Sequence, residues 1–124
     1  MEYFEELPPH CPPDGARRPN AETFYRLTDR FPPTEEDFYC PRRLFSERKF
    51  HNECVARAIS LFSTIGGCRQ VKKLPALKSK TVIIKIVLDE TSGKIQKTRE
   101  NSHYSWWRRR GFDPIPICEQ VDHG

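Results

Sequence analysis

Cysteine and histidine side chains are the first residues in the chain whose types and spacing could bind a metal ion. Cys40, His51, Cys54 and Cys68 form the pattern C-x10-H-x2-C-x13-C. Zinc takes thiolate and imidazole ligands, but structural zinc sites usually pair their ligands at short spacing, as only His51 and Cys54 do here. The alternative is that the cysteines are buried thiols that pack as small apolar side chains. No cofactor is predicted.

The same residue types could supply a nucleophile and a base. Cys54, Cys68 or Ser63, each with His51 or His103, would form such a pair. No local signature such as G-x-S-x-G surrounds any of these residues. The sequence therefore favours a protein that is not an enzyme.

The segment at 102–112, SHYSWWRRRGF, combines aromatic rings with arginines. Aromatic faces stack on bases, and arginine pairs with phosphate, so this segment predicts a nucleic-acid or nucleotide interface. The alternative is that the tryptophans belong to the core and the arginines line its rim. The candidate ligand-binding residues are His103, Tyr104, Trp106, Trp107, Arg108, Arg109 and Arg110.

The length of 124 residues allows one domain and excludes kinases, TIM barrels and doubly wound dinucleotide enzymes. The net charge of +4 is unevenly spread. Residues 1–40 carry −5 and residues 69–110 carry +9. Such a layout fits a polyanionic partner, or acidic ends that fold back over a basic middle.

The five cysteines show no C-x-x-C pair, and the acidic N-terminus lacks the apolar segment of a signal peptide. These features predict a cytoplasmic protein with reduced thiols. No apolar run approaches the roughly 20 residues that span a bilayer, so no membrane association is expected.

Prolines mark residues 1–20 as an extended arm that precedes a single domain over 21–124. Alternating apolar and polar residues predict a strand at 22–28. Thr34 begins a short helix that Pro41 ends. Residues 51–64 are ambiguous, and a helical turn before Arg57 followed by a strand at 58–63 is favoured.

In the second half, a glycine pair at 66–67 ends that strand, and 68–74 is the next helix. Residues 81–89 predict a central strand buried on both faces. A turn then leads to an exposed hairpin partner at 94–100, an extended segment at 103–107 and an edge strand at 115–121. The fold class is α+β, with a small, mostly antiparallel sheet and one or two short helices.

Four segments together resemble a group of short uncharacterised bacterial proteins: Tyr25–Leu27, Asp37-Phe38, Cys54–Phe62 and His103–Trp107. The similarity covers about 100 residues. It implies a small bacterial domain that stands alone, and it implies no particular activity.

A fainter similarity is to the ADP-ribosyltransferase fold. In that fold an early strand carries an arginine or histidine that holds NAD, a later strand carries a Ser-x-[ST] type motif, and a glutamate completes catalysis. Arg26 and Ser63 stand in the matching order, and Glu119 is the glutamate near the last strand. The similarity implies an NAD-dependent transferase with these three catalytic residues.

These observations favour a small bacterial module that binds another protein, in a setting such as defence, toxin–immunity or inhibition. Acidic ends beside a basic segment suit charged protein recognition. The nucleic-acid interface at 102–112 and the transferase are the two alternatives.

Overall fold

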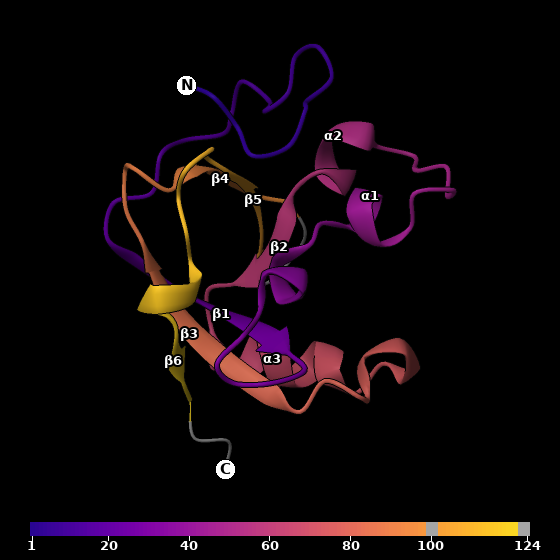
Figure 1. Cartoon of the computed structure of the whole chain (residues 1–124), viewed down its shortest axis with the longest axis vertical. Helices are drawn as coiled ribbons and strands as arrows, with labels where there is room; N and C mark the ends of the chain where they lie inside the picture. Colours follow the sequence, from indigo (N-terminus) through magenta and orange to yellow (C-terminus); the bar gives the residue numbers. More distant parts are fainter. Residues whose placement is uncertain (99–101, 122–124) are drawn as a thin grey trace.

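A computed structural model describes residues 1–98 and 102–121 and confirms the predicted α+β class. The strands are β1 (Glu22–Thr28), β2 (Ile59–Phe62), β3 (Val82–Leu88), β4 (Gly93–Lys97), β5 (His103–Arg108) and β6 (Glu119–Gln120). They form one antiparallel sheet in the order β4-β5-β2-β1-β3-β6 (Figure 1).

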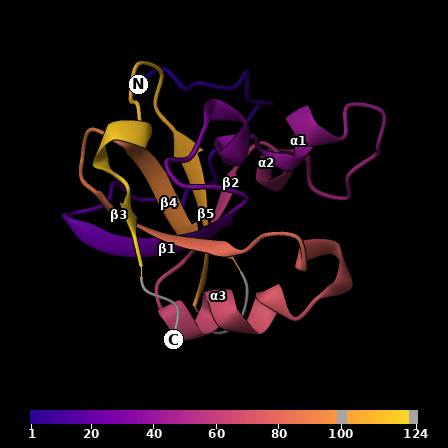
Figure 2. The same cartoon turned by 60° about the horizontal axis from the view of Figure 1, so that its bottom comes forward.

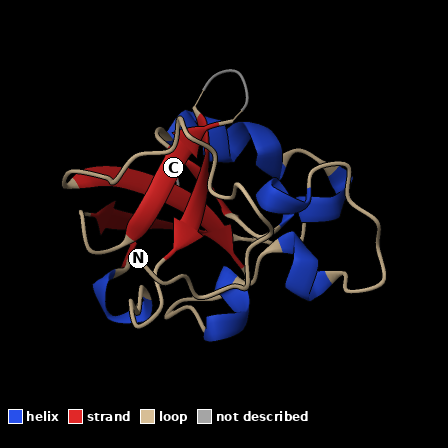
Figure 3. Cartoon of the chain, turned by 90° about the horizontal axis from the view of Figure 1, so that it is seen from above, coloured by secondary structure: helices blue, strands red, loops and turns tan. Residues whose placement is uncertain are grey.

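Three short α-helices accompany the sheet where one or two were predicted. They are α1 (Pro41–Leu44), α2 (Glu53–Ala56) and α3 (Ile65–Lys72), with 3-10 turns η1 (Glu35–Phe38), η2 (Pro75–Leu77) and η3 (Ile115–Ile117). Figure 3 shows these helical segments distributed around the strands. Half of the six have a side-chain cap at the N-terminus: Thr34 and Asp37 form a capping box at η1, the Asn52 side chain accepts from Val55 N at α2, and Thr64 caps α3.

The strand predicted at 81–89 forms β3, and it pairs with β1 over seven residues, from Glu22↔Leu88 to Thr28↔Val82. The expectation that this strand is buried on both faces holds for part of it, since Ile83 is buried on the α3 face and Ile84 on the opposite face. It is wrong near the end of the strand, where the Val87 side chain is exposed, and among the described residues the two-residue β6 alone lies beyond β3. The predicted edge strand at 115–121 is this short β6, preceded by η3.

The segment predicted at 94–100 as an exposed hairpin partner of β3 folds differently. Its described part is β4, which pairs with β5 at the other edge of the sheet. Ile95 in β4 is fully buried. The turn after β3 therefore crosses to the opposite edge instead of reversing into a hairpin. Residues 99 and 100 lie outside the described part of the chain.

Helix α3 covers one face of the sheet, and Figure 2 shows it below the strands. The helix predicted over 68–74 instead spans Ile65–Lys72, so the glycine pair lies inside α3 and does not precede it. Thr64 supplies the cap, since its Oγ1 accepts from Gly67 N at 3.0 Å. The apolar side chains that pack between α3 and the sheet include Leu27, Cys68 and Ile83. The larger apolar cluster on the opposite face includes Phe24, Leu61 and Trp106.

The proline-rich arm at 1–20 docks on the domain. Tyr3 forms an antiparallel bridge with Arg109, and Arg17 forms one with Ile95 of β4. A disulfide joins Cys11 of the arm to Cys54 of α2.

The expectation of fully reduced thiols is therefore wrong for Cys11 and Cys54. Disulfides persist in oxidising compartments, so the cysteines no longer support a cytoplasmic location, which stays a prediction. Among the described helices, none has the length and apolar character that crossing a bilayer requires.

Candidate ligand pocket

Strands β1 and β2 diverge after a single register pair, Tyr25↔Phe62. The carbonyl oxygen of Ser60 in β2 accepts its hydrogen bond from a side chain of β1, since Arg26 Nη1 donates to it at 2.7 Å. The arginine thus fills the place that regular strand pairing would occupy. A cavity opens beside this gap.

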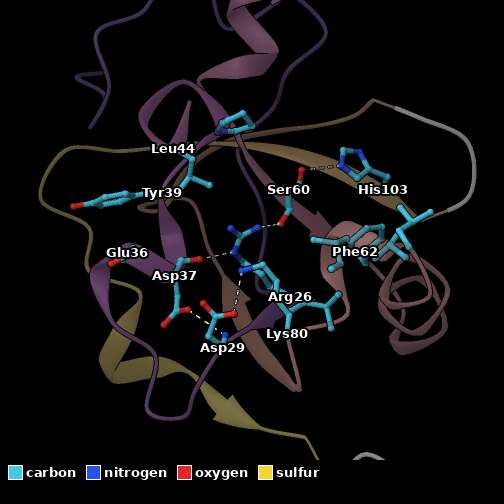
Figure 4. A pocket seen from close by; sticks show the side chains of 15 residues that line it. Arg26, Asp29, Glu36, Asp37, Tyr39, Leu44, Ser60, Phe62, Lys80 and His103 are labelled. Carbon is cyan, nitrogen blue, oxygen red and sulfur yellow. Dashed lines mark hydrogen bonds and ion pairs between the residues drawn. The ribbon is translucent and has the colours of Figure 1, made fainter. Parts of the chain in front are cut away.

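The cavity has a volume of about 300 Å3 (Figure 4). Its apolar wall combines side chains of β1, α1, β2, α3 and the segment that follows α3. The apolar lining residues are Leu27, Pro41, Leu44, Phe62, Val71, Leu74 and Leu77. Leu44 and Leu74 are about half exposed and lie at the rim. This volume falls at the lower end of the range for small-molecule sites.

The Arg26 guanidinium forms the cationic wall of the cavity. Its Nε donates to the Asp37 carbonyl oxygen at 3.0 Å, and the guanidinium carbon, Cζ, lies 5.9 Å from the centre of the Phe38 ring. Burial lowers the pKa of Arg26 to about 10, so the group stays protonated at neutral pH. The charge of the Asp37 carboxylate offsets part of this effect, although no carboxylate among the described residues lies within ion-pair distance of Arg26. A half-buried cation held by neutral carbonyl groups favours an anionic partner.

A hydroxyl and an imidazole lie together in the same cavity wall. Ser60 Oγ is 3.1 Å from His103 Nε2. The other ring nitrogen of His103, Nδ1, is 2.9 Å from Thr98 Oγ1, and that hydroxyl is 2.8 Å from Ser105 Oγ. The register explains the contact, because Ser60 is paired with Ser105 and His103 with Phe62. The chain of hydrogen bonds holds the imidazole ring in place.

Carboxylates line the opposite side of the cavity from His103. The Asp37 carboxylate accepts from the main-chain N–H groups of Thr34, at 2.8 Å, and Asp29, at 3.2 Å. The Asp29 carboxylate pairs with Lys80 at 3.5 Å. In Figure 4 the side chains of Asp29 and Asp37 lie on one side of Arg26, whereas Ser60 and His103 lie on the other. Most of this negative charge is therefore engaged within the protein.

Comparison with protein-family models, with curated proteins and with solved structures gives no match. Both resemblances noted in the sequence therefore stay predictions. The chemistry of the pocket rests on its own geometry.

The predicted aromatic interface at 102–112 is largely internal. Trp106 and Trp107 are at most 1% exposed, and both indole N–H groups donate to main-chain oxygens. Neither ring is available for stacking on a base, so the prediction that these tryptophans bind nucleic acid is wrong. Tyr104 is half-buried and packs edge-on against Phe24.

The three arginines of that segment differ from one another. Arg108 is 7% exposed, forms an ion pair with Glu35 and donates to the Phe112 carbonyl oxygen. Arg109 and Arg110 are exposed, and Arg110 pairs with Glu2 of the arm at 3.0 Å. The segment thus contributes only His103 to the pocket.

The three residues suggested by the transferase similarity lie in separate places. Arg26 lines the pocket, whereas Ser63 lies in a different hollow beside Gly66 at the start of α3. Glu119 is exposed on β6 and pairs with Lys85. This arrangement does not assemble a three-residue site.

The predicted metal ligands are also apart. Cys54 is consumed by the disulfide, His51 is exposed, and Cys40 and Cys68 are fully buried. Within residues 1–98 and 102–121, no three histidine, cysteine, aspartate or glutamate side chains are grouped as metal ligands. Burial raises the pKa of Cys68 to about 12, so its thiol is also a poor nucleophile.

Ser60 and Lys80 are pocket residues that sequence reasoning missed. Ser60 is the one polar residue of the β2 sequence ISLF. A hydroxyl inside a short apolar strand is the signal that could have indicated it.

Proposed function

We propose that the protein binds a small organic anion in the pocket beside β1 and β2. The observation that carries the proposal is the half-buried Arg26 guanidinium, which lines the cavity and donates hydrogen bonds to the main-chain carbonyl oxygens of Asp37 and Ser60. A carboxylate or phosphate oxygen would supply the opposite charge and would accept a charge-assisted hydrogen bond.

The rest of the wall supports a ligand with an apolar body. Val71, Leu74 and Leu77 form one apolar side of the cavity, and Leu44 closes the rim. An anionic head on Arg26 would leave such a body against these side chains. Burying apolar ligand surface there adds affinity at roughly 25 cal/mol per Å2.

Binding is tested by titrating 15N-labelled protein with benzoate, phenyl phosphate and the neutral match benzyl alcohol. The two anions should shift the Arg26 Nε–H signal, and benzyl alcohol should bind more weakly. Arg26→Gln should raise Kd roughly 10- to 100-fold, since a hydrogen bond to a charged group contributes about 1.5–3 kcal/mol. Arg69→Gln, an exposed position on α3, is the control and should bind as the native protein does.

Equal binding of all three compounds, or unchanged affinity in Arg26→Gln, would contradict the proposal. The interaction-module function stays a prediction. Its motivation weakens in one respect, because ion pairs within the protein already engage arm acids such as Glu2 and Glu5.

A further inference from the structure

Ser60 and His103 meet the geometric requirements of a nucleophile with its base. Their Oγ and Nε2 atoms are 3.1 Å apart, and both residues line the cavity. A hydroxyl is a weak nucleophile at neutral pH, and an imidazole within hydrogen-bond reach activates it by taking its proton.

The imidazole is oriented by a third group, as such a base requires. Thr98 Oγ1 can accept from His103 Nδ1–H while its own hydroxyl donates to Ser105 Oγ. In that arrangement Nε2 carries no proton and accepts from Ser60. The hydroxyls of Thr98 and Ser105 can therefore accommodate the tautomer that a general base needs.

Arg26 adds positive charge to the wall of the same cavity. Its Nη1 donates to the carbonyl oxygen of Ser60 at 2.7 Å, whereas the Ser60 hydroxyl contacts His103 (Figure 4). A cation held in a partly buried site stabilises negative charge that develops during attack on a carbonyl group. The hydroxyl, the imidazole and the guanidinium thus line one cavity from β2, β5 and β1.

We propose that the pocket hydrolyses esters of small carboxylic acids, with Ser60 as the nucleophile and His103 as the general base and acid. This proposal rests on the proposed function in one respect, that the same pocket admits a small organic molecule. Ser60 Oγ forms a bond to the acyl carbon while its proton passes to His103 Nε2. The bond from that carbon to the alcohol oxygen breaks, and His103 returns the proton to the departing alcohol.

Water then attacks the acyl-serine with His103 as the base. The acid is released, and Ser60 regains its proton. The two steps consume one ester and one water and release one alcohol and one acid. No oxidant, metal or further reactant is needed.

The first test treats the native protein with diisopropyl fluorophosphate, which forms a phosphoryl–serine bond and releases fluoride and a proton. Intact mass should show one adduct per chain, and peptide mapping should place it on Ser60. An adduct that maps to another residue, or no adduct, would overturn the proposal. This readout requires no variant and so does not depend on a mutant folding.

The second test compares rates in variants that keep the native circular dichroism spectrum. His103→Gln should slow labelling, and the hydrolysis of 4-nitrophenyl acetate, by about 100-fold or more. Ser63→Ala removes a serine of the neighbouring hollow and should react as the native protein does. Rates unchanged in His103→Gln would overturn the role of the base.

Benzoate binding separates this inference from the proposed function. If benzoate shifts Arg26 but no adduct forms, the pocket binds anions and the hydrolase proposal is wrong. If Ser60 is labelled at a rate that depends on His103 while benzoate does not bind, the hydrolase proposal stands and the anion site is wrong.

Discussion

Burial keeps the thiols at Cys40, Cys68 and Cys118 protonated. It raises the pKa of Cys68 and of Cys118 to about 12, and it raises the pKa of Cys40 as well. Protonated thiols react slowly with electrophiles. We therefore expect Ellman's reagent at pH 8 to label the native protein slowly and the denatured, unreduced protein at three thiols per chain, since one disulfide uses two of the five cysteines.

The same thiols make stability depend on pH in a known direction. A folded-state pKa above the unfolded value of 9.0 means that the unfolded chain ionises first, so this contribution to stability declines as pH rises above 9.

In the experiment with Ellman's reagent, five reactive thiols in the denatured, unreduced protein would show that the disulfide is absent.

Arg26 shows why only part of the site could be predicted from its residues. The alternation in ETFYRLT predicts the strand that carries it, and the transferase similarity singled it out. The sequence does not reveal that β1 and β2 pair at one position and that the side chain bridges the gap between them. Such a bridge depends on contacts between residues 34 positions apart.

At the scale of elements, the two glycines of α3 have different surroundings. A Cβ on Gly67 would lie 2.1 Å from Ser102 Oγ and 2.9 Å from the Phe62 ring, whereas one on Gly66 would meet nothing closer than 3.9 Å. Gly67→Ala should cost roughly 1–3 kcal/mol of unfolding free energy through overpacking. Gly66→Ala should add up to about 1 kcal/mol through helix propensity.

Urea unfolding at 25 °C measures both glycine variants. Equal changes of the midpoint in the two variants, or changes in the reverse order, would contradict the difference in crowding between Gly66 and Gly67.

The disulfide links the arm to α2 across 43 residues of sequence. Closing a loop of that length restricts the unfolded chain by about 4 kcal/mol in the chain-entropy estimate. Cys11→Ser and Cys54→Ser should each lower the unfolding free energy by about that amount. The double variant should lose no more than either single one, and Cys118→Ser serves as the control. Fully additive losses would indicate that the two cysteines act separately.

The sequence predicts single elements better than it predicts their pairing. Local alternation and β-branched residues locate β1 and β3 to within two residues, and the interpretation favoured for the ambiguous segment 51–64 does the same for β2. The pairing of β4 with β5 depends on which distant strand buries Ile95, and no local pattern contains that information. The start of α3 was predicted too late for a similar reason. The Thr64 cap and packing against Phe62 outweigh the low helix propensity of the two glycines.

At the scale of the whole molecule, the acidic ends fold back over the basic part of the chain. Glu2 pairs with Arg110, Glu5 with Arg43 and Glu35 with Arg108. Positive charge that would attract a polyanion is thus partly neutralised within the protein. This is the arrangement expected if the acidic ends fold back over the basic middle of the chain.

Tryptophan emission tests this internal arrangement. Because both indoles are buried, the native emission should be blue-shifted and weakly quenched by acrylamide, and urea should shift it to the red. Single-stranded oligonucleotide at low salt should leave it unchanged. A red-shifted native signal that oligonucleotide protects would contradict the burial of both rings.

The bond between Cys11 and Cys54 closes the intervening chain into a covalent ring. That ring contains β1 with Arg26 and the exposed segment between α1 and α2, which carries Arg48 and Lys49. A protease that cuts there leaves both fragments joined by the disulfide, so the nicked protein has the mass of the intact chain plus one water until a reductant separates the fragments. Cleavage in this segment, unlike cleavage after Cys54, therefore leaves Arg26 covalently attached to the strands that carry Ser60 and His103.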